Sequence, residues 1–272
     1  MINNKLPLSI VIPCADDVRI KHCLDSIDEK VEVMVVLNGA TKEVLNIVDD
    51  YDVKVVKIKE RNLSKALNIG IKTAKNPKVI LVDSDCRFEK GAIKKLFGGL
   101  QKYYIAKGKV VFQSNSLISE TIAKVRDYIY YDPPKPYNPF LAIKKDIKEL
   151  IGNYYFDETI HWTEDADLNT RLKKAGIEVN YVFSAKVFHP PLGLKHDLRS
   201  VFRYGIGKRI RVEKGVSSGI GTHFGKILHV GFKKGLLTSL YYFIWNCSFL
   251  FGYLYQAVKD PYRVRPQFIE QK

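Results

Sequence analysis

Short apolar runs alternate with amphipathic segments over the first third of the chain, and this alternation restricts the possible folds more than any other feature. Apolar runs typical of buried strands occupy Leu8–Pro13, Val31–Leu37, Val53–Ile58 and Val79–Val82. Apolar residues recur at helical spacing in the intervening segments 20–27, 41–48 and 62–74. Strands and helices in alternation predict an α/β fold with a doubly wound, mostly parallel sheet flanked by helices. Ligands of such sheets bind at the carboxyl ends of the strands, where Pro13, Asn38 and Asp83 fall.

The middle of the chain is less regular. Further elements are expected at Gly108–Gln113 (strand), Leu117–Tyr131 (helix), Thr163–Ala175 (helix), Val179–Phe183 (strand) and Lys186–Phe188 (strand). The prolines of Asp132–Pro139 exclude regular structure there, because each removes a backbone donor and fixes φ. We interpret this segment as a rigid spacer rather than as a substrate-facing loop.

The chain of 272 residues is strongly basic, with a formal net charge of +15 from 44 Lys and Arg against 29 Asp and Glu. Such a surplus suggests nucleic acid, an anionic membrane surface or a phosphate-rich ligand as partner, unless the lysines simply form a solvated surface. The four cysteines form no CxxC pair, and scattered thiols fit a reducing compartment. Because Met1–Lys5 has no apolar run, no secretory signal is expected there.

Two carboxylates follow the fourth apolar run, at Asp83 and Asp85. Alternate residues of an extended backbone point the same way, so both side chains can turn toward one point. Like charges that close are unfavourable unless a cation or proton lies between them, and carboxylate oxygens suit Mg²⁺ or Mn²⁺ that carries a phosphate. The alternative is a capping turn, with Asp85 as N-cap of a helix that starts near Glu89.

A second acidic pair, Glu164 and Asp165, stands at the start of the helix predicted from Thr163. The helix dipole and free N–H groups favour carboxylates there, so the pair could simply stabilise the helix, with Thr163 as N-cap. A carboxylate fixed at a helix start can also act as a general base toward a hydroxyl group. His189, before two prolines, is either a metal ligand or a structural histidine.

Several short motifs resemble, in order and spacing, those of family 2 glycosyltransferases. They are Ser9–Pro13, Asn62–Gly70, Asp83–Asp85, Phe156–Glu158 and Glu164–Leu168 with Arg171 and Gly176. The resemblance extends from about Leu8 to His189. It implies a GT-A fold, a nucleoside-diphosphate sugar donor and a divalent metal, Mg²⁺ or Mn²⁺.

This resemblance places the nucleotide base against the backbone of Pro13, Cys14 and Ala15, with Asp17 beside it. Two positions depart from the family pattern. Asn38 stands where an aspartate often reads uracil, and Cys14-Ala15 replaces a dipeptide that ends in tyrosine. An amide offers both a donor and an acceptor, so the choice between UDP and GDP stays open.

The same resemblance implies the roles of the catalytic residues. Asp83 would face the ribose and the metal, Asp85 would bind the metal, and His189 would complete its coordination. Asp165 would be the base that deprotonates the acceptor hydroxyl. The stretch Arg203–Arg209 is similar to a basic segment that clamps the diphosphate, here through Arg203, Lys208 and Arg209. The remaining candidates are Lys65, Ser84 and Arg87 for the sugar nucleotide, and Trp162 and Glu164 for the acceptor side.

The C-terminal part has a different character. Asp197–Lys214 is a basic helical segment, and no charged residue lies between Lys234 and Lys259. The run Gly235–Val258 is long enough to span a bilayer, but a polar stripe along it favours a helix at the membrane surface over a span or a soluble packing helix. The stripe consists of Ser239, Tyr242, Asn246, Tyr253 and Gln256. Basic flanks suited to anionic headgroups are Lys233, Lys234, Lys259, Arg263 and Arg265.

We therefore expect a GT-A catalytic domain over residues 1–196 and a C-terminal helical appendage that contacts the membrane over 197–272. The predicted function is a metal-dependent inverting glycosyltransferase of the hexosyltransferase type, at the cytoplasmic face of a membrane. It would act on a glycan or lipid-linked acceptor and not on nucleic acid. The alternative, motivated by the charge of +15, is a catalytically silent protein of the same fold that binds nucleic acid or a membrane surface.

Overall fold

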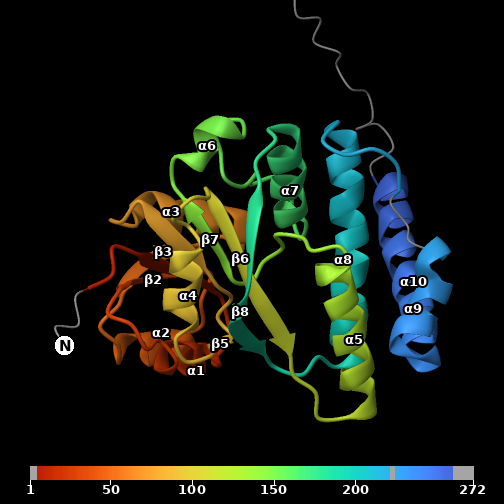
Figure 1. Ribbon diagram of the computed structural model, residues 1–272, viewed down its shortest axis with the longest axis horizontal. Coiled ribbons are helices and arrows are strands. Elements are labelled where there is room, and N and C mark those ends of the chain that lie inside the picture. Colours follow the sequence, from red (N-terminus) through yellow and green to blue (C-terminus); the bar gives the residue numbers. More distant parts are fainter. Residues whose placement is uncertain (1–4, 221–223, 260–272) are drawn as a thin grey trace, which may run out of the picture.

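A mixed sheet forms the centre of the computed structural model, which describes residues 5–220 and 224–259 (Figure 1). Its strands are β1 Ser9–Cys14, β2 Glu32–Asn38, β3 Lys54–Ile58, β4 Lys78–Leu81, β5 Arg87–Phe88, β6 Ile105–Phe112, β7 Leu141–Lys144 and β8 Val179–His189. They lie in the order β3-β2-β1-β4-β7-β6-β8-β5. Strands β1 to β4 are parallel, as are β6 and β8, whereas β7 runs antiparallel between β4 and β6. The predicted mostly parallel sheet is confirmed, and β7, which the sequence did not predict, supplies an antiparallel part.

Helices cover both faces of the sheet. The helices are α1 Ile20–Asp25, α2 Lys42–Asp49, α3 Leu63–Thr73, α4 Ala92–Gly98, α5 Leu117–Tyr131, α6 Ile147–Leu150, α7 Glu164–Lys174, α8 Leu194–Glu213, α9 Ile227–Lys234 and α10 Leu236–Lys259. Apolar residues of α1, α2 and α4 pack on one face of the sheet, and those of α3, α6 and α7 pack on the other. Capping follows the sequence: the side chains of Thr41 and Asn62 accept hydrogen bonds from the first-turn N–H groups of α2 and α3.

Three local expectations are wrong. Asp85 caps no helix near Glu89, because β5 follows it and α4 begins only after Gly91, whose φ is +75°. Thr163 holds the N-cap position of α7, but its side chain accepts no capping hydrogen bond. The two late strands are one strand, β8, with an irregularity opposite Gly108 and Lys109 that lets the pairing continue to the end of the strand.

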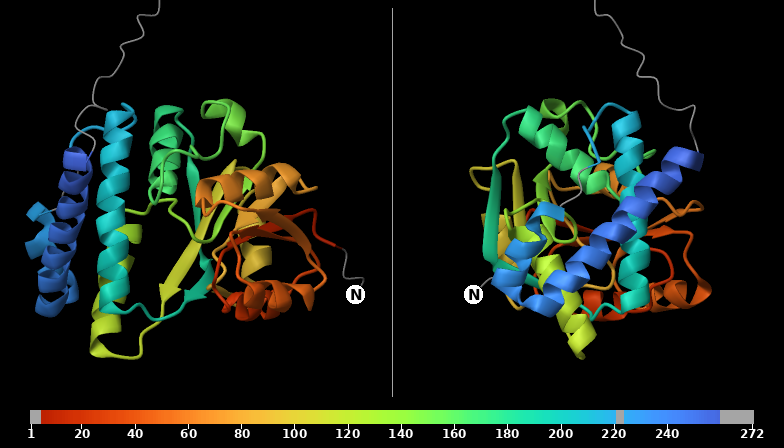
Figure 2. Two further views of the ribbon diagram at one scale, coloured as in Figure 1. Left: turned by 180° about the vertical axis from the view of Figure 1, so that it is seen from behind. Right: turned by 90° about the vertical axis from the view of Figure 1, so that its right-hand side faces the viewer.

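The remaining helices form a separate layer beside the sheet, with α9 and α10 outermost (Figures 1 and 2). A third apolar cluster joins residues of α5, α8, α9 and α10, among them Val125, Val201, Val230 and Tyr242. Helix α5 therefore contributes to the core of the C-terminal layer although it precedes residue 196, and α8 begins at Leu194. The division at 196/197 stays a prediction.

Helices α8 and α10 approach each other closely. A Cβ atom at Gly205 would overlap the carbonyl oxygen of Phe249, and one at Gly252 would overlap the carbonyl oxygen of Phe202. Glycine at both positions lets the two backbones touch, as small residues do at other close helix crossings. This reciprocal contact fixes α10 to α8 along its length.

The predicted polar stripe of α10 faces the protein: Ser239, Tyr242, Asn246, Tyr253 and Gln256 are all buried. Within residues 5–220 and 224–259, no helix combines the length and apolarity needed to cross a membrane. Among the predicted basic flanks, Lys233 and Lys234 pair with Asp132 and Asp127 on and after α5. The described residues do not include Arg263 and Arg265. They also do not include residues 1–4, where no secretory signal was expected.

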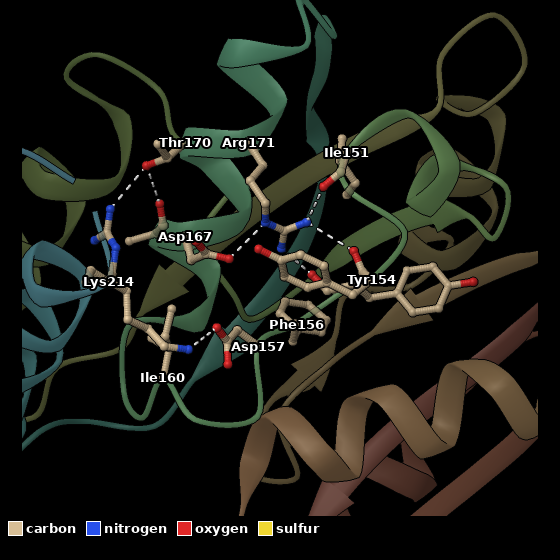
Figure 3. A network of polar contacts seen from close by, with 12 residues as sticks. Ile151, Tyr154, Phe156, Asp157, Ile160, Asp167, Thr170, Arg171 and Lys214 are labelled. Carbon is tan, nitrogen blue, oxygen red and sulfur yellow. Dashed lines mark hydrogen bonds and ion pairs between the residues drawn. The ribbon is translucent and has the colours of Figure 1, made fainter. Parts of the chain in front are cut away.

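Helix α7 is anchored by Arg171 (Figure 3). The guanidinium of Arg171 donates to Asp167 Oδ2 at 2.8 Å. It also donates to the carbonyl oxygens of Ile151 and Tyr154, both at 3.0 Å, and of Tyr155 at 2.5 Å. The side chains of Arg171 and Asp167 are only 9% and 0% exposed. Since Asp165 lies in the first turn of α7, this network also fixes the position of that carboxylate.

We predict that Arg171→Met lowers the free energy of unfolding by roughly 3–5 kcal/mol, because it leaves a buried carboxylate without its cation. The matched control is Lys124→Met, which removes an exposed pair with Glu120 on α5 and should change stability by less than about 0.5 kcal/mol. Urea unfolding of the two variants measures the difference. Equal midpoints would mean that the Arg171 network does not hold α7.

Candidate functional site

A cavity of about 470 Å³ lies between the carboxyl ends of the central strands and the helical layer. Asp83, after β4, and His189, at the end of β8, lie on the sheet side. Glu164 and Asp165 enter from the start of α7, and Trp245 and Phe249 enter from α10. The cavity is thus located where ligands of an open α/β sheet are expected.

One face of α8 forms the opposite wall. Its lining residues are His196, Ser200, Arg203, Tyr204, Lys208 and Arg211. They recur every three or four positions, as one helix face does, and at 1.5 Å per residue the stretch from His196 to Arg211 extends for roughly 22 Å. The wall is long enough to serve more than one ligand group.

The proline-rich segment also contributes to the wall, through Lys135, Tyr137, Asn138 and Pro139. The backbone N–H of Asn138 donates to Asp165 Oδ2 at 3.2 Å. The interpretation of this segment as a spacer was therefore wrong. Its prolines hold a loop in the site rather than separating two elements.

Asp85 and His189 form a pair at the strand ends. Asp85 Oδ2 lies 3.4 Å from His189 Nε2, and Nδ1 of the same ring lies 2.8 Å from the carbonyl oxygen of Pro190. A carbonyl oxygen only accepts, so Nδ1 carries the proton and Nε2 presents its lone pair toward Asp85. Burial lowers the pKa of His189, which favours this neutral form.

This pair fits a divalent cation. A neutral imidazole held by a backbone carbonyl, next to a carboxylate, is a usual arrangement of metal ligands. Mg²⁺ typically takes one or two protein ligands and fills its other positions with phosphate oxygens and water. Within the part of the chain that the structure describes, no three His, Cys, Asp or Glu side chains gather to hold a metal, so the role of Asp83 as a third ligand stays a prediction.

Arg19, which sequence reasoning missed, lies beside this pair. Its guanidinium is 3.4 Å from Asp85 Oδ2, and its Nε donates to Asp17 Oδ1 at 2.8 Å. These contacts make Asp17 a partner of Arg19, and they leave its predicted role beside the base pocket untested. Arg19 precedes α1 directly, at a position where only the fold reveals its approach to Asp85.

The acidic groups of the cavity differ in charge state. Burial, reinforced by the charge of Asp85, raises the pKa of Asp83 to about 7. Burial and the neighbouring Asp165 strongly raise the pKa of Glu164, whose Oε2 has no hydrogen-bond partner. Burial also raises the pKa of Asp165, but N–H groups of Ala166 and Asn138 and the charge of Arg211 limit the rise. Glu164 therefore holds the proton of the pair, and Asp165 is the carboxylate.

Four of the positive side chains that line the cavity lack acidic partners. Among the described residues, Lys135, Arg203, Lys208 and Arg211 form no ion pair within 4.0 Å, although all four line the cavity. Arg203 lies over the ring of Trp162 at 5.8 Å, and Arg211 donates to Thr170 at 3.1 Å while its Nε has no partner. Unpaired cations in an enclosed site favour an anionic ligand.

Arg211 was not among the site residues predicted from the sequence. It follows Lys208 by three residues and shares its helix face, whereas Arg209 is turned by about 100° toward α10. Arg209 instead donates to Glu213 at 2.7 Å and to the hydroxyl of Tyr253 at 3.4 Å. Extending the basic stretch by helical periodicity would have found Arg211.

Two further candidates lie outside the cavity wall. Lys65 pairs with Glu60 at 2.8 Å, and Arg87 is exposed over the ring of Phe188 at 5.5 Å. Their roles toward the sugar nucleotide, like that of Arg209, stay predictions. On the acceptor side, Trp162 lines the cavity with 41% of its surface exposed and a φ of +64°, a backbone conformation that often marks functional sites.

The predicted base pocket lies at the ends of β1 and β2. Pro13, Cys14 and Ser84 are buried, Ala15 is partly exposed, and Cys14 Sγ lies 3.6 Å from the carbonyl oxygen of Asp17. Asn38 is only 8% exposed, and its Oδ1 has no hydrogen-bond partner. A buried amide oxygen of this kind is unfavourable unless a ligand or water donates to it.

Comparison with known proteins defines the family. The model of glycosyl transferase family 2 matches residues 9–148, just over half of the chain, and the chain therefore belongs to that family. It is a glycosyltransferase with the GT-A fold. Among curated proteins, no match to this sequence was found.

Three solved structures share the fold. A mannosyltransferase from Pyrobaculum calidifontis, in complex with GDP-Man and Mn²⁺, is 14% identical with a TM-score of 0.63 over 96% of this chain and 89% of that one. TarS 1–349 of S. aureus, with UDP-GlcNAc, is 16% identical with a TM-score of 0.55, and the match covers 75% of this chain and 66% of TarS. Glucosyl-3-phosphoglycerate synthase from Mycobacterium tuberculosis, in complex with Mn²⁺, UDP and phosphoglyceric acid, is 16% identical with a TM-score of 0.55. The match covers 73% of this chain and 76% of that one.

Proposed function

We propose that this glycosyltransferase moves a sugar from a nucleoside-diphosphate donor to an acceptor hydroxyl, with Mg²⁺ or Mn²⁺ as cofactor and inversion at the anomeric carbon. One observation carries the proposal: Asp165, the unpaired cations of α8, Asp83 and His189 line a single cavity, and Asp85 lies 3.4 Å from His189. The ligands in the three similar structures support it, since each is a complex with a nucleotide or a nucleotide sugar.

The donor would lie along the strand ends. Asp85 and His189 would hold the divalent cation, and Arg203, Lys208 and Arg211 offer positive charge to the diphosphate. When bound, the cation offsets the charge that develops on the departing diphosphate. The unsatisfied Oδ1 of Asn38 can accept from a ring N–H of either uracil or guanine, so the site suits a UDP-sugar or a GDP-sugar.

Asp165 would accept the proton of the acceptor hydroxyl. The N–H of Asn138 and the charge of Arg211 keep it ionised, while Glu164 beside it stays protonated and avoids a second buried charge. A hydroxyl so activated attacks the anomeric carbon opposite the diphosphate, and a single displacement of this kind inverts the configuration. Trp162 and Glu164 would border the acceptor.

The acceptor that we propose is a glycan or a lipid-linked molecule at the cytoplasmic face of a membrane. Trp245 and Phe249 give the cavity an apolar border on the α10 side, which suits an acceptor with an apolar part. Membership of family 2 favours the enzyme over the silent binding protein considered as an alternative. Nucleic acid has no part in the proposal.

Calorimetric titration with UDP- and GDP-sugars, with and without Mn²⁺, tests the donor class. We expect one nucleotide class to bind only with Mn²⁺, and Asp85→Asn to abolish this metal-dependent binding because it removes an anionic ligand. Asp49→Asn, an exposed change at the end of α2, is the control and should bind as the unchanged protein does. Undiminished binding in excess EDTA, or by Asp85→Asn, would refute the metal site.

A second test separates the base from donor binding. Asp165→Asn should lower donor turnover roughly a hundredfold or more, the usual contribution of a positioned base, and leave the donor dissociation constant within about threefold. Slow hydrolysis of the donor in the absence of acceptor measures turnover, and titration measures binding. A collapse of donor affinity would place Asp165 in the donor site instead.

A further inference from the structure

The outer surface of α9 and α10 is apolar. Its large side chains, here called the outer apolar face, are Leu228, Phe232, Leu236, Leu237, Leu240, Phe243, Ile244, Phe251, Leu254, Tyr255 and Val258. They are 41–91% exposed, with Phe232 at 91% and Leu236 at 86%. The two helices form the outermost layer on the side away from the sheet (Figures 1 and 2). Contiguous apolar surface of this kind marks an interaction site.

The polarity of α10 is the reverse of that of an ordinary surface helix. Its polar stripe faces the protein, where Ser239 Oγ donates to the carbonyl oxygen of Ile227 at 2.7 Å and Asn246 Nδ2 donates to that of Tyr242 at 2.7 Å. A helix that faces water places its polar residues outward. The polar groups of Ser239 and Asn246 are thus satisfied within the protein, and the apolar side of α10 faces outward.

The charge of the same segment is uniformly positive. From Lys214 to Lys259 the chain contains no Asp or Glu but carries Lys214, Lys226, Lys233, Lys234 and Lys259. Lys226 and Lys259 are exposed near the start of α9 and at the end of α10. Lys214, Lys233 and Lys234 pair with Asp157, Asp132 and Asp127, which leaves Lys226 and Lys259 as the exposed positive charges at the border. Apolar side chains bordered by such lysines complement an anionic bilayer surface.

A second copy of the chain fits this face less well. A symmetric dimer would place the same patch against itself, and therefore bring its lysines together without a single acidic partner from this segment. Like charges at an interface oppose association. The charge pattern thus favours lipid over self-association.

We propose that the outer apolar face docks on an anionic lipid bilayer, with α10 parallel to the membrane plane. Exposed apolar residues extend from Leu236 to Val258, roughly 33 Å of helix at 1.5 Å per residue, so the whole helix lies on the surface rather than entering by one end. The inner side of the same helix supplies Trp245 and Phe249 to the cavity. The cavity therefore lies about one helix diameter, roughly 10 Å, from the lipid.

This position would present the site to an acceptor attached to a membrane lipid. That consequence rests on the proposed function, whereas docking itself does not. The face differs from the one expected from the sequence, because the polar stripe contacts the protein and not the headgroups.

Vesicle flotation of the full chain, without sugar nucleotide, tests the proposal. The protein should float with vesicles of 7:3 phosphatidylcholine and phosphatidylglycerol, bind pure phosphatidylcholine at least tenfold less, and be partly released by salt. The triple variant Phe232→Ser, Leu236→Ser, Phe251→Ser should lose binding at least tenfold. Lys226→Gln and Lys259→Gln should each weaken binding to the anionic vesicles roughly fivefold.

The matched control is Leu117→Ser, Ile118→Ser, Leu150→Ser, which changes three exposed apolar residues of α5 and α6 outside the face and should float normally. Light scattering of each protein reports self-association, and circular dichroism reports folding. Absence of flotation, equal binding by both triple variants, or a dimer that only the α9–α10 triple variant dissociates would each overturn the proposal. None of these results would bear on donor binding, which is measured without lipid.

Discussion

The central constraint of this structure is the gathering of acidic groups at one point. Asp83, Glu164 and Asp165 come from two distant parts of the chain and line one cavity, with Asp85 two residues beyond Asp83. Burial raises the pKa values of these three lining acids, and the charge of a neighbouring carboxylate reinforces the rise for Asp83 and Glu164. Such an arrangement is unfavourable unless cations or protons compensate it. Arg19 and Arg211 supply part of the compensation, and a divalent cation on Asp85 and His189 would supply more.

Helix α8 connects this acidic centre with the rest of the molecule. One face of α8 turns Arg203, Lys208 and Arg211 into the cavity, and the neighbouring face packs on α10 through the close contacts at Gly205 and Gly252. Arg126 of α5 is held by Asp197 of α8, a buried pair with 2.7 Å between Nε and Oδ1. The helical layer is thus a wall of the site. The opposite side of this layer carries the outer apolar face of α9 and α10.

The sequence predicted those parts of the fold that local patterns determine. The strands β1 to β4 and the bounds of α5 follow from apolar periodicity. Strand β7 was missed, since its Leu141–Lys144 run is short and follows the prolines, and its place depends on pairing with β4 and β6. The role of the proline-rich loop was missed for the same reason: its contact with Asp165 joins residues 27 positions apart.

The sequence predicted the acidic residues and the histidine of the candidate site, but not which basic residues of α8 face the cavity. Asp83, Asp165 and His189 line the cavity as the motifs implied, whereas Arg209 faces away and Arg211 takes the position on the wall. The orientation of α10 could not be read from its stripe, because a polar stripe on an apolar helix fits both a protein contact and a headgroup contact. Only the packing against α8 decides between them.

The central claim is that Asp85 and His189 hold the metal that carries the donor diphosphate. Crystals grown with Mn²⁺ and the nucleoside diphosphate that binds allow a direct measurement by anomalous diffraction. We predict one strong Mn²⁺ peak about 2.1–2.3 Å from both Asp85 Oδ2 and His189 Nε2, with the remaining coordination from phosphate oxygens and water. A nucleotide bound in the cavity with no Mn²⁺ peak at this pair, or with the peak elsewhere, would contradict it.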